Sequence, residues 1–207
     1  MKLLWHHSAI AALVALAPLS AAAAPAAVGS PALAWQSVGT LSPAAGYAEN
    51  IGVAGLVQGT FGDCIIVGGG KQDGTLSKKF YTYDVKTGML SSLPDFPGEP
   101  REQSVAEFLG GRLYVFSGGA NVAYTDGYAY DPKTRAWTEI KGPNVDSTPV
   151  SLLGARSVRL NADEMLVVGG FNHEIYNWAV SNLSTLQGEE KYAEPRRRVV
   201  PLTEHLS

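Results

Sequence analysis

Three short apolar runs, each ending in a pair of glycines, recur along the chain. They span Cys64–Gly70, Arg112–Gly119 and Glu164–Gly170. Aligned on their terminal glycines, they recur after 49 and then 51 residues. Continuous apolar runs rich in β-branched and aromatic residues are typical of strands buried on both faces, and a glycine pair favours a turn with positive φ. The pattern therefore predicts three copies of one β unit.

A second pattern follows the first two runs. Phe80–Asp84 and Gly127–Asp131 alternate in polarity and end in Tyr-x-Tyr-Asp, which predicts a further strand in each copy. Turn residues come next, with Pro132 at the second position of a type I turn, and Leu90 and Trp137 then begin outer strands. Four strands in about 50 residues are typical of a kelch repeat, one blade of a β-propeller. We predict an all-β, kelch-type propeller whose Tyr and Trp side chains pack between blades.

The innermost strand of each blade is expected just before each glycine-ended run. The predicted inner segments are Gly52–Gly59, Glu102–Gly110 and Pro149–Leu160. Trp35–Pro43 resembles the outer strand and exit turn of one more blade, an arrangement in which an N-terminal strand closes the ring. After Gly170 the apolar spacing becomes helical, and Asn172 is a plausible N-cap.

The two ends of the chain differ from the blades. Residues 1–24 resemble a secretory signal peptide, with Lys2, an apolar core and a run of small residues, although an uncleaved anchor remains the alternative. We expect a linker over 25–34, blades over 35–170, a short helical insertion over 171–187 and an irregular charged tail over 188–207. The mature protein is expected to be periplasmic or secreted, with no membrane segment after cleavage.

Length limits how much of a ring the chain can form. Without residues 1–24, 183 of the 207 residues remain. At about 50 residues per blade that is fewer than four blades, whereas propellers close with about four to eight. We therefore expect about three blades of an incomplete ring. Either an oligomer or another partner completes the propeller, or the sequence is a fragment of a longer protein.

The composition argues against several kinds of partner and site. A net charge of −3 gives no reason to expect nucleic acid as a partner, and Arg196–Arg198 has the pattern of a solvated run. Cys64 is the only cysteine, so no internal disulfide can form. Beyond residue 24 the histidines are His173 and His205, in different segments, so we expect no metal site and no cofactor.

Polar residues on the inner strands are the candidates for binding, because those strands face the central channel of a propeller. Arg101 precedes one inner strand, and Arg156 occupies a comparable place in the next repeat. Two guanidinium groups would suit a carboxylate or a polyol, since arginine presents a rigid fork of donors. The alternative is a structural role, in which each arginine donates to carbonyls of a neighbouring blade.

Four segments resemble motifs of the sialic acid mutarotases, exported bacterial kelch propellers also described as N-acetylneuraminate epimerases. They are Gly52-Val-Ala-Gly55, Pro100-Arg-Glu-Gln103, Gly111–Gly119 and Gly169-Gly-Phe-Asn-His-Glu-Ile-Tyr176. Their order is similar to that in the cyclically permuted branch of the family. The resemblance covers about Trp35 to Gln187 and implies a six-bladed isomerase that speeds exchange between the anomers of sialic acid.

The resemblance also implies which residues contact the sugar. Arg101, Gln103, Arg156 and Asn172 would be pocket residues for a small sialic acid-like sugar or a glycan. The family's acid/base pair, a Glu and an Arg, lies in the blade after the helical insertion, so no residue of this chain is assigned to catalysis. Three interpretations stay open: a shortened mutarotase-like protein, a non-catalytic kelch module that binds glycan or protein, and an inactive remnant.

Overall fold

The computed structural model describes residues 34, 37–43, 46–50, 52–190 and 193. The predicted signal peptide, nearly all of the predicted linker, Trp35 and most of the charged tail lie outside the described residues. No helix in the described part is both long enough and apolar enough to cross a membrane.

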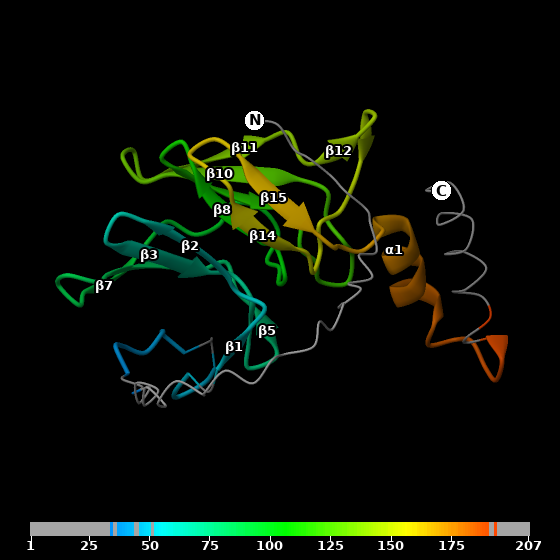
Figure 1. Cartoon of the computed structure of the whole chain (residues 1–207). Helices are drawn as coiled ribbons and strands as arrows, with labels where there is room; N and C mark the ends of the chain where they lie inside the picture. Colours follow the sequence, from blue (N-terminus) through cyan, green and yellow to red (C-terminus); the bar gives the residue numbers. More distant parts are fainter. Residues whose placement is uncertain (1–33, 35–36, 44–45, 51, 191–192, 194–207) are drawn as a thin grey trace, which may run out of the picture.

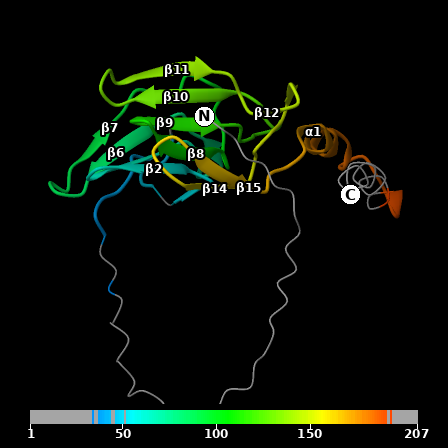
Figure 2. The ribbon, with the colours of Figure 1, turned by 45° about the horizontal axis from the view of Figure 1, so that its top comes forward.

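Antiparallel sheets form three successive blades (Figures 1 and 2). The first blade has the order β2-β3-β6-β7, the second β11-β10-β9-β8, and the third pairs β14 with β15. This arrangement confirms the predicted kelch-type propeller fold. The strand bounds are β2 Val57–Phe61, β3 Cys64–Gly68, β6 Phe80–Asp84, β7 Leu90–Ser92, β8 Val105–Leu109, β9 Arg112–Phe116, β10 Gly127–Asp131, β11 Ala136–Ile140, β14 Arg156–Arg159 and β15 Met165–Val168.

Loops at the blade ends carry shorter strands. A three-stranded sheet has the order β1-β4-β5, and β12 pairs with β13. The bounds are β1 Val53–Ala54, β4 Lys71–Gln72, β5 Thr75–Leu76, β12 Asn144–Val145 and β13 Thr148–Pro149. The predicted inner strand Gly52–Gly59 is thus wrong in its bounds. Gly55, with φ of 64°, turns the chain between β1 and β2 and so separates a loop strand from the true inner strand.

The predicted outer strand over Trp35–Pro43 is wrong for the described residues 37–43, which form no strand. The carbonyl of Ser42 instead accepts a hydrogen bond from Nε2 of Gln72 at 2.8 Å, which holds this segment beside β4. Val38 in this segment is exposed, so its side chain does not join the core of a blade. The backbone of the segment is therefore anchored by a side chain and not by the ladder of a sheet.

The glycine-ended runs turn as predicted in the first and third blades, but one residue earlier in the second. Gly69–Gly70 and Gly169–Gly170 all have positive φ. In the second run the positive pair is Ser117, with φ of 57°, and Gly118, with φ of 87°. The Ser117 N–H donates to the Asp126 carbonyl at 3.0 Å, as the Gly69 N–H donates to Lys79. The structural repeats are therefore 48 and 52 residues apart.

Two apolar clusters join the blades. The cluster between the first and second blades comprises Val57, Ile66, Phe80, Leu93, Phe96, Phe108, Leu113, Val115, Tyr128 and Tyr130. Trp137 packs against it, 5.0 Å from the Phe80 ring, and donates to the Pro94 carbonyl at 3.1 Å. The cluster between the second and third blades comprises Val105, Leu109, Phe116, Leu152, Ala155, Met165 and Val167. The predicted packing of Tyr and Trp side chains between blades is confirmed for the first interface.

One helix follows the third blade. α1 spans His173–Asn182, and Oδ1 of Asn172 accepts from the Ile175 N–H at 3.0 Å, which confirms the predicted N-cap. The helix is tied to the second blade, because Oδ1 of Asn177 accepts from the Ala123 N–H at 2.7 Å. In Figure 1 the helix lies beyond the end of β15 and not over the strands of the third blade.

Candidate functional site

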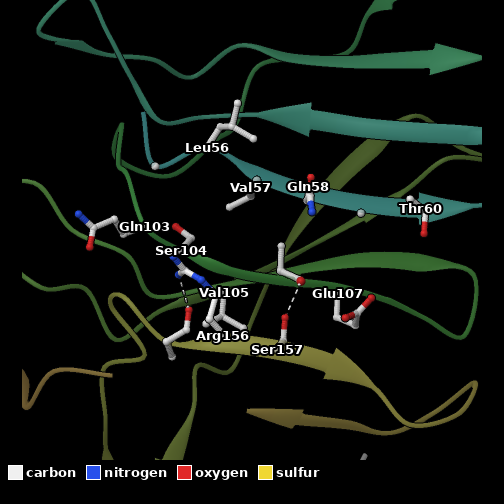
Figure 3. Close-up of a pocket in the computed structure, with 14 residues that line it drawn as sticks. Leu56, Val57, Gln58, Thr60, Gln103, Ser104, Val105, Glu107, Arg156 and Ser157 are labelled. Carbon is white, nitrogen blue, oxygen red and sulfur yellow. Dashed lines mark hydrogen bonds between the residues drawn. The ribbon is translucent and has the colours of Figure 1, made fainter. Parts of the chain in front are cut away.

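A cavity of about 370 Å³ lies along the inner strands of the three blades. β8 runs between β2 and β14, and side chains from all three strands face the same space (Figure 3). Seven of the lining residues have polar side chains: Gln58, Thr60, Gln103, Ser104, Glu107, Arg156 and Ser157. This surface corresponds to the channel side of a propeller, where binding was expected.

Backbone hydrogen bonds set the spacing between the three inner strands. The Gln103 N–H donates to the Gly55 carbonyl at 2.8 Å, and the Gln103 carbonyl accepts from the Gly154 N–H at 3.0 Å. All three residues have positive φ, which is unusual for glutamine. The turn in each blade is thus bonded to the turn in the next, and this fixes the position at which the Gln103 side chain enters the cavity.

Arg156 and Glu107 are the charged residues of the lining. Arg156 is exposed at the start of β14, and its Nη1 donates to the Ala155 carbonyl at 3.0 Å. Glu107 is half-buried on β8, where Oε1 accepts from the Phe108 N–H at 3.1 Å. The neighbouring Ser157 hydroxyl donates to the Ala106 carbonyl at 2.9 Å. The lining can therefore offer a guanidinium to an anion and several amide or hydroxyl groups to a polyol.

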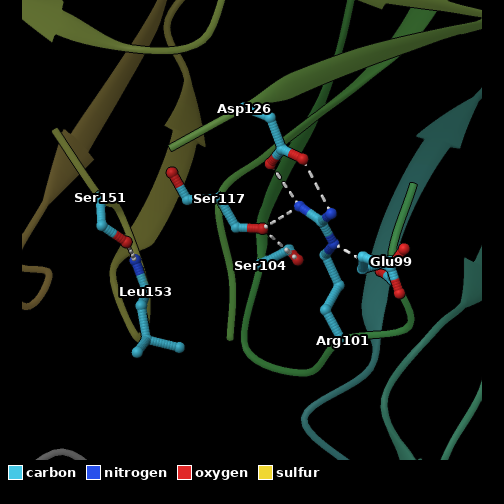
Figure 4. A network of polar contacts seen from close by, with 7 residues as sticks. All are labelled: Glu99, Arg101, Ser104, Ser117, Asp126, Ser151 and Leu153. Carbon is cyan, nitrogen blue, oxygen red and sulfur yellow. Dashed lines mark hydrogen bonds and ion pairs between the residues drawn. The ribbon is translucent and has the colours of Figure 1, made fainter. Parts of the chain in front are cut away.

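Arg101 lies in a different environment (Figure 4). Its side chain is only 4% exposed and forms an ion pair with Asp126, with Nη2 to Oδ2 at 2.8 Å. Nε donates to the Glu99 carbonyl at 2.8 Å, and Nη1 donates to the Ser117 carbonyl at 3.0 Å. The guanidinium also lies 4.2 Å from the centre of the Tyr124 ring. These contacts give Arg101 the structural role that the sequence left open, and they hold Ser117 in its left-handed conformation.

The structure thus separates the four predicted site residues. Gln103 and Arg156 line the cavity, whereas Arg101 is buried behind it and the Asn172 side chain caps α1. That these residues bind a substrate stays a prediction. The sequence analysis did not identify the polar side chains on the strands themselves, such as Gln58, Thr60 and Glu107. A signal for two of them was present, because Gln58 and Thr60 alternate with Val57 and Gly59 and so face away from the core.

The described residues contain no group of three or more His, Cys, Asp or Glu side chains that could hold a metal ion. The cavity lining offers hydrogen-bond donors and acceptors, the Arg156 guanidinium and the Glu107 carboxylate. Such a set can bind and orient a small, hydroxyl-rich anion.

Comparison with known proteins gives consistent results. A family model described as N-acetylneuraminate epimerase matches residues 72–200. The chain is 37% identical over 106 residues to N-acetylneuraminate epimerase of Yersinia enterocolitica, an alignment that covers 47% of this chain and 26% of that protein. It is 34% identical over 137 residues to the protein of the same name from Pasteurella multocida, covering 63% of this chain and 34% of that protein.

A solved structure, titled "Structure of YjhT", shares the fold with a TM-score of 0.56 and 22% identity, over 70% of this chain and 42% of that one. The chain spans between about a quarter and a third of the length of the two curated relatives named above. Since the family model covers more than half of the 207 residues, the chain belongs to the N-acetylneuraminate epimerase family.

Proposed function

We propose that this chain supplies the sugar-binding inner face of an exported, N-acetylneuraminate-specific mutarotase. The observation that carries the proposal is the cavity on the inner strands, which brings Gln103 and Arg156 together with Glu107 in a member of this family. N-acetylneuraminate carries a carboxylate, several hydroxyls and an amide, and the lining offers a partner for each of these groups.

Binding would follow from the chemistry of the lining. The exposed Arg156 guanidinium can pair with the sugar carboxylate, because arginine matches carboxylate geometry with two parallel donors. The amide of Gln103 and the hydroxyls of Ser104 and Thr60 can bond to sugar hydroxyls. Since the three strand starts are bonded to one another, these groups are held in place before the sugar arrives.

Mutarotation opens the sugar ring, which requires a proton on the ring oxygen and removal of the proton from the anomeric hydroxyl. The resemblance implies that the acid/base pair lies in a blade after the helical insertion. We therefore assign binding and orientation to the residues described here, and no proton transfer. On this proposal the chain alone binds the sugar and leaves the exchange of its anomers at the spontaneous rate.

The test measures sugar binding and anomer exchange by NMR on freshly dissolved N-acetylneuraminate. Arg156→Gln should weaken binding about ten- to a hundredfold, because a hydrogen bond to a charged group contributes about 1.5–3 kcal/mol. Arg135→Gln is the matched control, since Arg135 lies at the β10–β11 turn and donates to the Ser92 carbonyl, away from the cavity. Absence of binding, or equal losses in both variants, would contradict the proposal; faster exchange by the chain alone would contradict the assignment of roles.

A non-catalytic glycan-binding module is the second candidate. It is favoured by the single carboxyl of the lining, Glu107, one of whose oxygens already accepts from the backbone. This candidate predicts that neutral oligosaccharides bind as tightly as N-acetylneuraminate and that Arg156→Gln has no effect on them. A preference for the acidic sugar that disappears in Arg156→Gln favours the mutarotase proposal instead.

A further inference from the structure

The inner strand of each blade opens at an equivalent turn. In each blade the turn lies two residues before the first pair of the ladder between the inner strand and the next one. The residue at that place has positive φ in all three blades. Two of the three are glycines and one is a glutamine: Gly55, Gln103 and Gly154, with φ of 64°, 57° and 76°. At this position, therefore, only the second blade carries a side chain.

A glutamine at positive φ lowers stability. In the left-handed region the Cβ of a residue crowds the backbone, and glycine, asparagine and aspartate are the residues commonly found there. The backbone of this turn does not need a glutamine, because the Gln103 N–H and carbonyl bond to the neighbouring turns through peptide groups that glycine also has. Backbone strain of this kind concentrates at functional sites. The side chain of Gln103 therefore has a role beyond the fold.

A second residue of the same blade replaces a glycine for a structural reason. Arg135, with φ of 55°, stands where the first blade has Gly88, with φ of 70°, since both follow an Asp-x-Lys-Thr turn. The Arg135 side chain donates to the Ser92 carbonyl at 3.1 Å and so joins the second blade to the first. The side-chain amide of Gln103 has no such partner, because no described residue forms a hydrogen bond with it.

This free amide lies at the cavity. Gln103 and Arg156 both line it, and Figure 3 shows Gln103 at the end where β8 begins. Nη1 of Arg156 lies 3.4 Å from the Gly154 carbonyl oxygen, and a Cβ on Gly154 would lie 3.4 Å from Oε1 of Gln103. The glycine thus places no side chain between the amide and the guanidinium. The second blade has a blade on each side, so both neighbours of this turn are in place.

We propose that Gln103 is the specificity-determining residue of this site and recognises the acylamino group of the sugar. The inference rests on the proposed function and assigns the Gln103 amide to one substituent. A glutamine side chain offers an N–H donor and a carbonyl acceptor, which match the carbonyl and the N–H of an acetamido group. A hydroxyl on the same ring carbon does not extend far enough to bond to both.

The substituents of N-acetylneuraminate suit two separate anchors. Its carboxylate and its acetamido group are carried by ring carbons on opposite sides of the ring. One ring can therefore bring the carboxylate to Arg156 and the acetamido group to Gln103, which flank Gly154. Arg156 alone would accept any sugar acid, whereas Gln103 separates the acylated amino sugars from the others. The substrate class of the site is thus the N-acylated amino sugar acids.

Two sugars test this assignment in the full chain. One is N-acetylneuraminate, and the other is the analogue that carries a hydroxyl in place of the acetamido group. Titration calorimetry should show that the wild type binds N-acetylneuraminate about tenfold or more tightly than the analogue, because the analogue leaves the Gln103 amide without its partner. Gln103→Gly should bind the two sugars within about twofold of each other. Arg156→Gln should weaken the binding of both.

The stability of the variant is a readout that needs no sugar. Gln103→Gly restores the residue that both flanking blades carry, and the relief of strain outweighs the chain entropy that glycine gains on unfolding. The equilibrium constant for unfolding should therefore fall about two- to fivefold in urea titrations. Arg135→Gly is the matched control, because it also exchanges a left-handed side chain for the glycine of the first blade, away from the cavity. It should leave the preference between the sugars unchanged.

The outcomes separate this inference from the proposed function. Equal binding of the two sugars by the wild type, or a preference that persists in Gln103→Gly, overturns the inference; the proposed function stands if binding still depends on Arg156. Binding of neither sugar by the wild type overturns both. A preference that is also lost in Arg135→Gly overturns the assignment to Gln103. A clear loss of stability in Gln103→Gly would mean that the side chain is kept for the fold, which overturns it as well.

Discussion

The buried ion pair between Arg101 and Asp126 allows a quantitative test of what holds the loop before β8 against the second blade. Asp126→Asn keeps the size of the side chain and one acceptor oxygen but removes the negative charge. The Arg101 guanidinium, 4% exposed, then keeps its charge and loses its counter-ion. Its remaining acceptors are the carbonyls of Glu99 and Ser117.

The expected loss lies between two limits. Removing one partner of a fully buried pair costs about 3–5 kcal/mol, whereas exposed pairs contribute about 0–1 kcal/mol. Asp126 is 28% exposed, so water reaches one end of the pair and reduces the penalty. We expect Asp126→Asn to lower the free energy of unfolding by about 2–3 kcal/mol, close to the contribution of hydrogen bonds to charged groups.

Urea unfolding followed by circular dichroism, at one fixed protein concentration, measures this loss as a lower midpoint with an unchanged slope. Asp95→Asn is the control, because the Lys79–Asp95 pair also has 2.9 Å contacts but its side chains are 62% and 51% exposed. The control should lose less than about 1 kcal/mol. If Asp126→Asn lost no more than the control, the buried network would not be what holds Ser117 and the loop before β8 in place.

Two further predictions concern the turns. Gly70→Ala and Gly74→Ala both place alanine at a left-handed position, with φ of 80° and 82°, which costs roughly 1–2 kcal/mol. Only at Gly70 would the new Cβ also lie 2.7 Å from the oxygen of the Ala54 carbonyl, so thermal unfolding should show a clearly larger loss of stability for Gly70→Ala. Equal losses for the two variants would contradict this close approach. The pKa of Asp131 is held below its usual range chiefly by a hydrogen bond from the Lys133 N–H, and then by the Thr134 N–H and Arg112. The Asp131 carboxylate therefore stabilises the fold at pH values above its unfolded pKa of about 3.9. This stabilisation is lost as the pH falls through the lower pKa of the folded state. Asp131→Asn should therefore be less stable than the wild type in urea titrations at neutral pH and equally stable in strong acid; a pH-independent gap would contradict this.

The repeat period and the residue patterns of the strands could be predicted from the sequence because they are local signals. The two Tyr-x-Tyr-Asp segments form β6 and β10 with the predicted bounds, and Asn172 caps α1. The turn at Ser117 was not predictable, because a serine at positive φ is disfavoured locally. Contacts from Arg101 and Ser104, which are distant in sequence, stabilise it.

The candidate site was only partly predictable for a similar reason. An arginine near an inner strand suits both a ligand and a carbonyl of the next blade, and only the position of Asp126 decides between them for Arg101. Glu107 was missed because two consecutive apolar residues, Phe108 and Leu109, follow it within β8 and obscure the alternation of the strand. Neighbouring blades cover both faces of such a strand, so sequence alone does not separate channel positions from core positions.

The turns at Gly55, Gln103 and Gly154 have an evolutionary consequence. Neighbouring blades recognise one another there through peptide groups, with the Gln103 N–H and carbonyl bonded to the turn on either side. A backbone bond of this kind depends on chain conformation and hardly on side-chain identity, so a duplicated repeat could join the series without matching mutations in its neighbours. Gene duplication and circular permutation of such repeats would then preserve the junctions while the channel-facing side chains diverge toward new ligands.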